Sequence, residues 1–530
     1  MGGEEDQVMR DPHRVLLIAL LPISSACARS AVQSEPSADH GSLAEAVATI
    51  TAEDMRARIS YLASDELAGR DTPSPGLEMA AEYLAAQFES SGLEPGGDEG
   101  SFLQRYRLPL RALDTESVHF GTVDPDGSEN QMLEYGVDFF ASPAIDREGR
   151  DMQHGLLVYF GELPESGLPT SANVQGKVMV VSLPGAPDRD LRLRAASARR
   201  QAEDAGAAAL FLMLGPGFSA EMVGRMAELS AEPRRVLVDP DEIPVFYISH
   251  AAAAAILGQG GFDPAALGDL PASGVSLTGV EAHFVAVPST LEDSRPPNVA
   301  AIIRGSDPEL RDEYVVFSAH MDHVGIGTAD ATGDSIYNGA DDDASGTAAL
   351  VEVAEAFAAL EEPPARSLLF LAVSGEEKGL LGSRYFSDHP TVPLESIVAN
   401  INVDMIARNA PDSVVVIGQE YSSLGPLVRT VVAQSPSLGL TVVPDPWPEE
   451  RFFFRSDHFS FARKEIPALF FFAGVHEDYH RPSDEVDKID ADKAARVARL
   501  IFYTAHAIAD DASAPEWTEV GLTEIRALSR

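Results

Sequence analysis

Three stretches of this chain of 530 residues differ in how apolar and polar residues alternate. In the first, residues 49–112, apolar residues recur at helical spacing behind Thr51, whose Thr-Ala-Glu-Asp sequence predicts a capping box. A second helix with the same spacing is expected to run to Phe88. These helices have no sheet of their own to cover, so we expect them to pack on a domain that is encoded later.

The second stretch, residues 113–290, consists of short β-rich runs separated by Gly and Pro. One helix is expected among them, from Leu191 to Ala205. The pattern predicts a smaller β-rich domain inserted into the chain. It contains no spacing typical of metal ligands or of a catalytic nucleophile, so we expect a structural role or control of substrate entry.

The third stretch, residues 291–510, alternates apolar runs typical of buried strands with helical patterns. Strands are expected at Val299 to Ile303, Tyr314 to Phe317, Leu368 to Val373, Ile397 to Val403, Val414 to Ile417 and Ala468 to Phe472. Such alternation predicts an α/β fold with a mostly parallel twisted sheet and helices on both faces. Residues 511–530 are expected to form a loosely held tail.

The N-terminus has the outline of a signal peptide, residues 1–28, followed by a polar linker, residues 29–48. Basic residues precede the apolar run Val15 to Ile23, which is too short to span a bilayer permanently. We expect cleavage after Ala28, with a lipid anchor on Cys27 as the alternative. The mature protein is therefore predicted to be secreted, periplasmic or held at the cell envelope, with no transmembrane span.

The net charge limits the classes of binding partner, and the cysteine content limits the disulfide bonds. The formal net charge of −44 argues against nucleic acids and anionic membrane surfaces, which favour Lys and Arg. Cys27 is the only cysteine, so the mature chain has no internal disulfide bond.

Three consecutive carboxylates, Asp341 to Asp343, stand in the loop before the helix that starts near Gly346. Like charges in one site repel unless a cation neutralises them, so a metal ion is the natural partner. Asp343 or Ser345 is placed to cap the helix. By side-chain direction, Asp341 and Asp343 are not both expected to reach a metal.

Other metal-binding residue types follow the predicted strands, and sites in open α/β sheets form beyond the carboxyl ends of strands. These residues are His320, Asp322, Glu376, Glu377, Asp404, Tyr479 and His480. Two imidazoles and at least three carboxylates suffice for two zinc ions that share a carboxylate. Two such ions hold a water between them, lower its pKa and polarise a carbonyl. The Glu376-Glu377 pair then supplies one ligand and one base.

Five motifs in this order resemble the dizinc aminopeptidases of metallopeptidase family twenty-eight. They are His-x-Asp, Gly-Ala-Asp-Asp-Asp-Ala-Ser-Gly, Glu-Glu-x-Gly-Leu-x-Gly-Ser, Asn-x-Asp-Met and Tyr-His-x-x-x-Asp. The resemblance implies an aminopeptidase that acts on peptides with two zinc ions per chain, and a cis peptide bond after the bridging aspartate. The inserted stretch resembles a protease-associated domain.

The resemblance also implies a role for each residue of the site. His320 and Asp404 would bind one zinc ion, Glu377 and His480 the other, and Asp342 would bridge. Glu376 would be the general base. Asp322 would fix the tautomer of His320, and Tyr479 is a candidate for stabilising the oxyanion.

For several neighbouring residues we expect roles other than metal binding. We expect His323 to be a neighbour of the site and no ligand, because side chains alternate along an extended strand. Residues 476–478 are expected to be solvated, and Asp457 and His458 to be structural or in contact with substrate. The first Phe run, residues 452–454, offers an apolar wall.

Three other functions remain open from the sequence. The first is a carboxypeptidase-like hydrolase, for which Arg451 and Arg455 offer the necessary positive charge. The second is a glutaminyl cyclase with one zinc ion, and the third is a receptor-like binding protein without metals. The complete ligand set favours the dizinc hydrolase.

Overall fold

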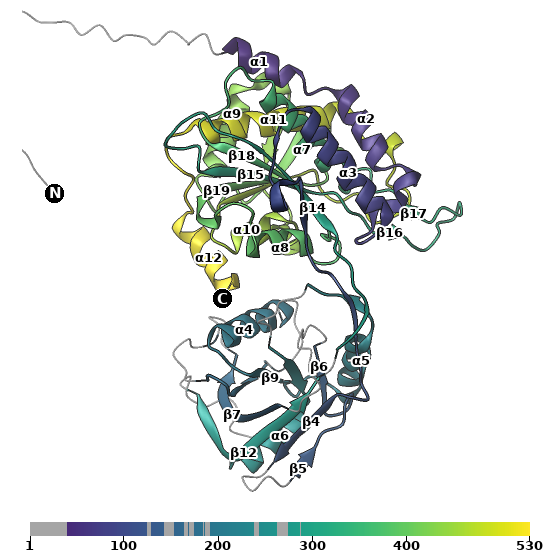
Figure 1. The fold of residues 1–530 in the computed structure, drawn as a ribbon, viewed down its shortest axis with the longest axis vertical. Coiled ribbons are helices and arrows are strands. Elements are labelled where there is room, and N and C mark those ends of the chain that lie inside the picture. The colour runs from purple at the N-terminus through teal and green to yellow at the C-terminus, as the bar shows by residue number, and fades with distance from the viewer. Residues whose placement is uncertain are drawn as a thin grey trace, which may run out of the picture. The chain divides into compact units, whose positions relative to one another are not determined.

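The computed structural model describes residues 40–123, 129–142, 153–163, 168, 174–183, 185, 191–237, 243–261, 274–286 and 288–529 (Figure 1). The predicted signal peptide, with Cys27, lies outside these residues. None of the described helices is both long and apolar enough to cross a membrane.

The sheet that carries the candidate site is formed by β1, β2, β14, β15 and β18 to β22, with four parallel strands at its centre. The central order is β18 (Ser367–Val373), β15 (Tyr314–His320), β19 (Ile397–Val403) and β22 (Ala468–Phe472). The flanking strands β14 (Pro297–Ile303) and β20 (Ser413–Ile417) run antiparallel to the central strands β18 and β22. Further out, β1 (Glu94–Pro95) and β2 (Leu103–Arg105) pair antiparallel with β14, and β21 (Thr441–Val443) pairs parallel with β20. The predicted α/β class is confirmed, although β14 and β20 run antiparallel to the central strands.

Alternation of side chains along each strand places two apolar cores on the two faces of this sheet. Val315 and Phe317 belong to a core shared with α2, α3, α7, α9 and α11, whereas Tyr314 and Val316 pack with Phe386 and Phe461 of α8 and α10. Figure 1 shows the two sets of helices on opposite sides of the sheet. The bounds are α2 (Ala52–Leu62), α3 (Pro75–Ser90), α7 (Ala344–Ala358), α8 (Leu381–Asp388), α9 (Leu424–Gln434), α10 (His458–Ala462) and α11 (Ala491–Asp510).

Two helices begin as the sequence indicates. The Thr51 hydroxyl accepts a hydrogen bond from Asp54 N at the start of α2, and Asp343 caps α7 through Gly346 N at 2.8 Å. The residues of α2 and α3 that were expected to pack on a later domain lie in the core they share with α7 and α11.

Residues between β3 (Leu110–Leu113) and β13 (Pro288–Glu292) form a second sheet with the order β5-β4-β12-β7-β8-β9-β11-β6. Its strands are β4 (His119–Val123), β5 (Glu129–Met132), β6 (Phe139–Ala141), β7 (Gln153–Glu162), β8 (Val178–Ser182), β9 (Ala209–Met213), β11 (Val245–Ile248) and β12 (Val275–Val285), with helices α4 (Leu191–Asp204), α5 (Ala220–Ala231) and α6 (His250–Gln259). β3 and β13 pair with each other, and β10 (Arg234–Arg235) joins them. This stretch thus has its own sheet and its own apolar cores.

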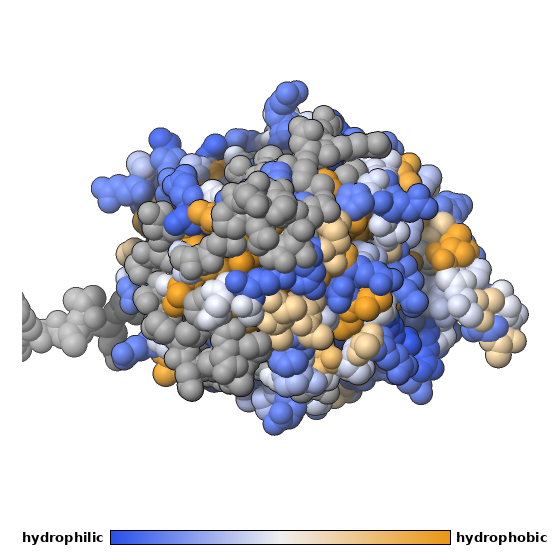
Figure 2. Space-filling view, turned by 90° about the horizontal axis from the view of Figure 1, so that it is seen from below, coloured by the Kyte–Doolittle hydropathy of each residue, from blue (hydrophilic) through white to orange (hydrophobic). Residues whose placement is uncertain are grey.

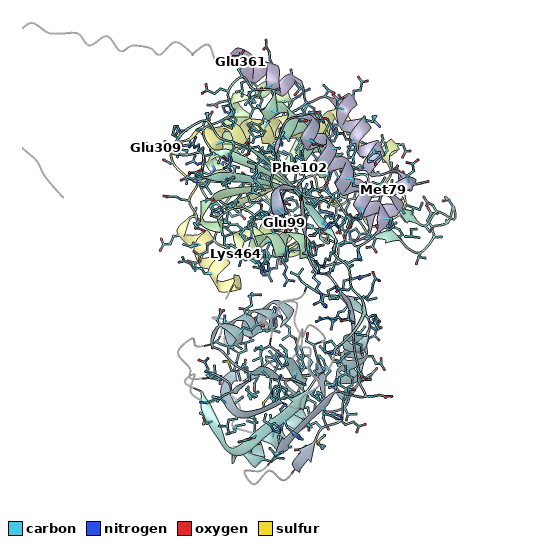
Figure 3. All side chains as sticks on the ribbon, in the orientation of Figure 1. Met79, Glu99, Phe102, Glu309, Glu361 and Lys464 are labelled. Atoms are coloured by element: carbon cyan, nitrogen blue, oxygen red, sulfur yellow. The ribbon has the colours of Figure 1, made fainter. Side chains whose placement is uncertain are left out.

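The described surface mixes hydrophilic and apolar residues, as the view from below shows (Figure 2). Part of the chain's negative charge lies on exposed acids such as Glu309 and Glu361, whose side chains stand at the periphery of the α/β part (Figure 3).

Two segments are more ordered than the sequence predicts. Within the expected linker, α1 (His40–Ala48) is helical, and Ala46 and Val47 are buried. The expected loose tail contains α12 (Glu519–Ser529), where Ile525 is 1% exposed and Arg526 contacts Glu465 at 2.7 Å. Burial of these few apolar side chains stabilises both helices, and in the linker it outweighs the polar composition on which the prediction rested.

Candidate metal centre

The carboxyl ends of four parallel strands and the start of α7 bring the predicted site residues together. His320 is the last residue of β15, Asp404 directly follows β19, and Glu376 and Glu377 lie in the loop after β18. Asp342 precedes α7, and His480 lies in the loop after β22.

Asp342 lies between two groups of donor atoms, and each of its two carboxylate oxygens faces one of these groups. On one side, His320 Nε2 is 3.3 Å from Asp342 Oδ1 and 3.5 Å from Asp404 Oδ1. On the other, His480 Nε2 is 3.1 Å from Asp342 Oδ2 and 3.0 Å from Glu377 Oε2. One carboxylate is therefore shared between two clusters of nitrogen and oxygen donors.

These spacings fit zinc. Two ligand atoms about 2.0–2.2 Å from a tetrahedral ion lie about 3.3–3.6 Å apart, close to the distances in both clusters. Asp342 Oδ2, Glu377 Oε1 and Asp404 Oδ1 are buried and make no hydrogen bond, which would be costly for carboxylates without a cation. The residues present thus fit two zinc ions.

The electrostatics of the site agree with this assignment. Burial lowers the pKa of His480, but the nearby carboxylates of Asp342 and Glu377 outweigh burial and raise the pKa to about 10. The negative field that holds a proton on this imidazole also favours a metal cation beside it. Burial, with the charges of Glu377, Asp457 and Asp404, raises the pKa of Glu376 well above its usual value, although His320 acts in the opposite direction.

The carboxylates of Asp341 and Asp343 accept hydrogen bonds from backbone N–H groups. This agrees with the expectation that the two side chains would not both reach a metal. Asp343 lies within ligand distance of His320 and Asp404. However, its oxygens accept hydrogen bonds from Gly346 N at 2.8 Å, Met405 N at 3.0 Å and His320 N at 3.2 Å. Asp341 Oδ1 accepts one from Ala407 N at 2.7 Å. The bond between Asp342 and Asp343 is cis, as expected.

Asp322 contacts both His320 and the loop that carries Glu376. Its backbone oxygen is 3.2 Å from His320 Nδ1, whereas its carboxylate is 3.8 Å from that nitrogen. The carboxylate accepts hydrogen bonds from Thr72 Oγ1 at 3.0 Å and Glu376 N at 3.3 Å. Thr72 Oγ1 also accepts from Gly375 N, so this threonine, which the sequence did not mark, holds the loop.

A small pocket of about 40 Å³ opens beside the first cluster. It is lined by His320, Asp342, Glu376, Asp404, Met405, Phe452, Arg455, Ser456, Phe470, Phe472, Val475 and Tyr479. The ring of Tyr479 stacks on His480 with a centroid distance of 3.9 Å. Phe452 provides the apolar wall expected of the first Phe run, and Phe470 and Phe472 extend it.

The expectation that residues 476–478 are solvated is wrong for two of the three. His476 Nε2 is 3.3 Å from Asp341 Oδ2, and Asp478 contacts Arg408 at 2.8 Å and Lys488 at 2.6 Å. Only Glu477 is exposed. The loop turns inward because these pairs tie it to Asp341 in the loop before α7, to Arg408 after β19 and to Lys488 further along the chain.

His458 is structural, and Asp457 lies buried beside the proposed base. His458 packs between the rings of Phe453 and Phe470, and burial lowers its pKa to about 3, so it is neutral. Asp457 is 0% exposed and raises the pKa of Glu376.

Two further residues escaped the sequence analysis. Ser456 donates to Asp404 Oδ2 at 2.8 Å and accepts from Asn402 Nδ2 at 2.8 Å; its only signal was its place directly before Asp457. The buried Arg70 donates to Met321 O at 2.9 Å and to Asn338 O at 2.7 Å, and no local pattern marks it.

Comparison with known proteins agrees with the site. Residues 298–505 match the model of Peptidase family M28. A probable zinc metalloprotease of Leptosphaeria maculans is 33% identical over 115 residues, which cover 22% of this chain and 25% of the relative. A probable leucine aminopeptidase of Arthroderma benhamiae is 25% identical over 221 residues, which cover 40% of this chain and 58% of the relative. The chain spans about a quarter of the length of the fungal metalloproteases it matches.

A solved aminopeptidase from Aneurinibacillus sp. strain AM-1 aligns with 90% of this chain and 97% of its own, at 18% identity and a TM-score of 0.45. All five proposed ligands and Glu376 fall within residues 298–505, the segment that matches the model of Peptidase family M28.

Proposed function

We propose that this chain is an exported aminopeptidase that uses two zinc ions to hydrolyse the N-terminal bond of peptides. The observation that carries the proposal is the position of Asp342, with Oδ1 3.3 Å from His320 Nε2 and Oδ2 3.1 Å from His480 Nε2. A carboxylate shared in this way is the arrangement expected of a two-metal site. The match of residues 298–505 to a peptidase family model and the names of the relatives support the reaction class.

His320 and Asp404 would hold the first zinc ion, and Glu377 and His480 would hold the second. Asp342 would bind both ions. Zinc supplies Lewis acidity: it lowers the pKa of water toward neutrality and polarises the carbonyl of the scissile bond. Asp322 acts on His320 mainly through its backbone oxygen, which accepts from Nδ1 and leaves Nε2 free to bind.

Glu376 is the proposed general base. Its carboxylate lines the pocket, and its backbone N–H donates to Asp322 Oδ1. The carboxylate would take a proton from the attacking water and give it to the amine that leaves. Tyr479, which lines the same pocket, is proposed to stabilise the oxyanion.

The inserted stretch is proposed to act as a protease-associated domain that restricts which substrates enter. Export rests on the N-terminal pattern, and a lipid anchor on Cys27 remains the alternative to cleavage. The sequence-level domain boundaries, 113–290 for the insert and 291–510 for the catalytic part, belong to the same proposal.

A carboxypeptidase-like reaction is the second candidate, because Arg455 lines the pocket and could bind a terminal carboxylate. Arg451 does not line this pocket, and its guanidinium lies over the ring of Phe454 at 4.7 Å.

Hydrolysis of a panel of aminoacyl anilides, with free and with N-acetylated amines, tests the proposal. We expect cleavage of the free amines only. Equal cleavage of blocked substrates, or release of C-terminal residues that is abolished in Arg455→Ala, would favour the carboxypeptidase-like reaction. Cyclisation of N-terminal glutamine without hydrolysis would favour the cyclase.

A further inference from the structure

His323, which the sequence analysis placed outside the ligand set, reaches the second cluster of donor atoms. Its side chain is fully buried, and Nδ1 lies 2.8 Å from Glu377 Oε1 and 3.7 Å from Asp342 Oδ2. The alternation of side chains that predicted otherwise ends with β15 at His320, so it does not govern the direction of His323.

The contact between His323 and Glu377 is close but is not a hydrogen bond. Both atoms are buried, and neither makes a hydrogen bond although they are 2.8 Å apart. Four protein ligands and a water make zinc five-coordinate, and in that geometry two neighbouring donors about 2.1 Å from the ion stand at about 90° and lie about 3.0 Å apart, shorter than the tetrahedral spacing. The pair therefore has the spacing of two donors that converge on a common point.

The other donors of the second cluster surround the same point. Asp342 Oδ2 is also buried without a hydrogen bond, and His323, Asp342 and Glu377 together form a buried group with the spacing of metal ligands. The ring of His323 stands at 73° to that of His480, with 5.6 Å between their centroids. Two imidazoles thus flank the carboxylates of this cluster.

The backbone leaves room for the His323 ring at this position. Gly339 has a φ of +58°, and a Cβ atom there would lie 2.6 Å from Cγ and Cδ2 of His323. A side chain at residue 339 would displace the imidazole, so glycine is required both for the turn and for the ring.

We propose that His323 Nδ1 is an additional ligand of the second zinc ion, beside Asp342, Glu377 and His480. This inference rests on the proposed two-zinc function. The two sites are then unequal, because the first has one imidazole, from His320, and the second has two.

Zinc affinities of variants, measured by competition with a chromophoric chelator, test the assignment. In His323→Ala, one of the two ions should bind more than about 100-fold more weakly, as in His480→Ala, while the other ion is unaffected. His506→Ala, which removes a half-buried imidazole paired with Asp510, should change neither affinity. Replacing a residue that only orients a ligand typically lowers metal affinity about 10–100-fold. A loss of zinc affinity in that range, or a smaller one, in His323→Ala would therefore overturn the proposal.

X-ray absorption at the zinc edge of the unaltered protein gives a second readout that does not depend on the folding of a variant. Three imidazoles for two zinc ions are expected, and two imidazoles would overturn the assignment. If the unaltered protein bound one zinc ion, the two-zinc function would fail. The assignment of His323 would then stand or fall on whether His323→Ala weakens that ion.

Discussion

Removal of the Ser456 hydroxyl should weaken the first zinc site without touching a proposed ligand. Ser456 is 1% exposed and donates to Asp404 Oδ2, while Asp404 Oδ1 faces His320. The hydroxyl thus fixes which oxygen of Asp404 is turned toward His320 and the proposed zinc ion. In Ser456→Ala the carboxylate is free to rotate, and Asn402 Nδ2 loses its acceptor.

The magnitude follows from these two contacts. Loss of a partner that orients a metal ligand costs about 10–100-fold in affinity, which is about 1.4–2.7 kcal/mol. Leaving the Asn402 amide without its acceptor costs about 1–3 kcal/mol in the free energy of unfolding. The variant should therefore lose both zinc affinity and stability of the metal-free protein, by similar amounts.

Chelator competition gives the affinity of each ion, and urea unfolding of the metal-free protein gives the stability. Ser460→Ala is the matched control, because this buried hydroxyl, four residues further along, contacts Ser383 at 2.9 Å and no proposed ligand. It should lower stability by about 1 kcal/mol and leave both affinities unchanged. Zinc affinity within twofold of the unaltered protein in Ser456→Ala would refute the reasoning.

Two further predictions concern the base and the loop of His480. Glu376→Gln should keep both zinc ions, measured by atomic absorption, while turnover falls about 10²–10⁴-fold; loss of zinc would mean that Glu376 is a ligand. Burial raises the pKa of Asp478, but Lys488, Ser483 and Arg408 outweigh burial and hold it well below the usual value. The stability that this carboxylate contributes is therefore present above about pH 4 and fades as the pH falls further. Urea unfolding should show Asp478→Asn about 1–3 kcal/mol less stable at pH 7, with a gap that narrows below pH 4; a gap independent of pH would contradict this.

The convergence of the five candidate ligands could be predicted because each of them stands near a local signal. His320 and Asp404 follow apolar strands, and Asp342 precedes a capped helix. The carboxyl ends of neighbouring parallel strands meet at one edge of a sheet, so such residues converge without further information. The α/β class follows from the same alternation of strands and helices.

The residues that the sequence missed act through contacts between distant segments. Arg70 reaches Met321 and Asn338 from a turn far earlier in the chain, and Ser456 reaches Asp404 from beside α10. For His323 the period-two rule was applied beyond the end of its strand, where it no longer holds. Local sequence patterns do not reveal these contacts, because the contacts form between segments that are far apart in the chain.

Zinc titration of the metal-free protein, compared with Asp342→Asn, tests the central claim most directly. The position of Asp342 between two clusters predicts two zinc ions per chain, with both affinities reduced in the variant. A single zinc ion, or a variant in which only one of two affinities falls, would contradict the shared carboxylate on which the account depends.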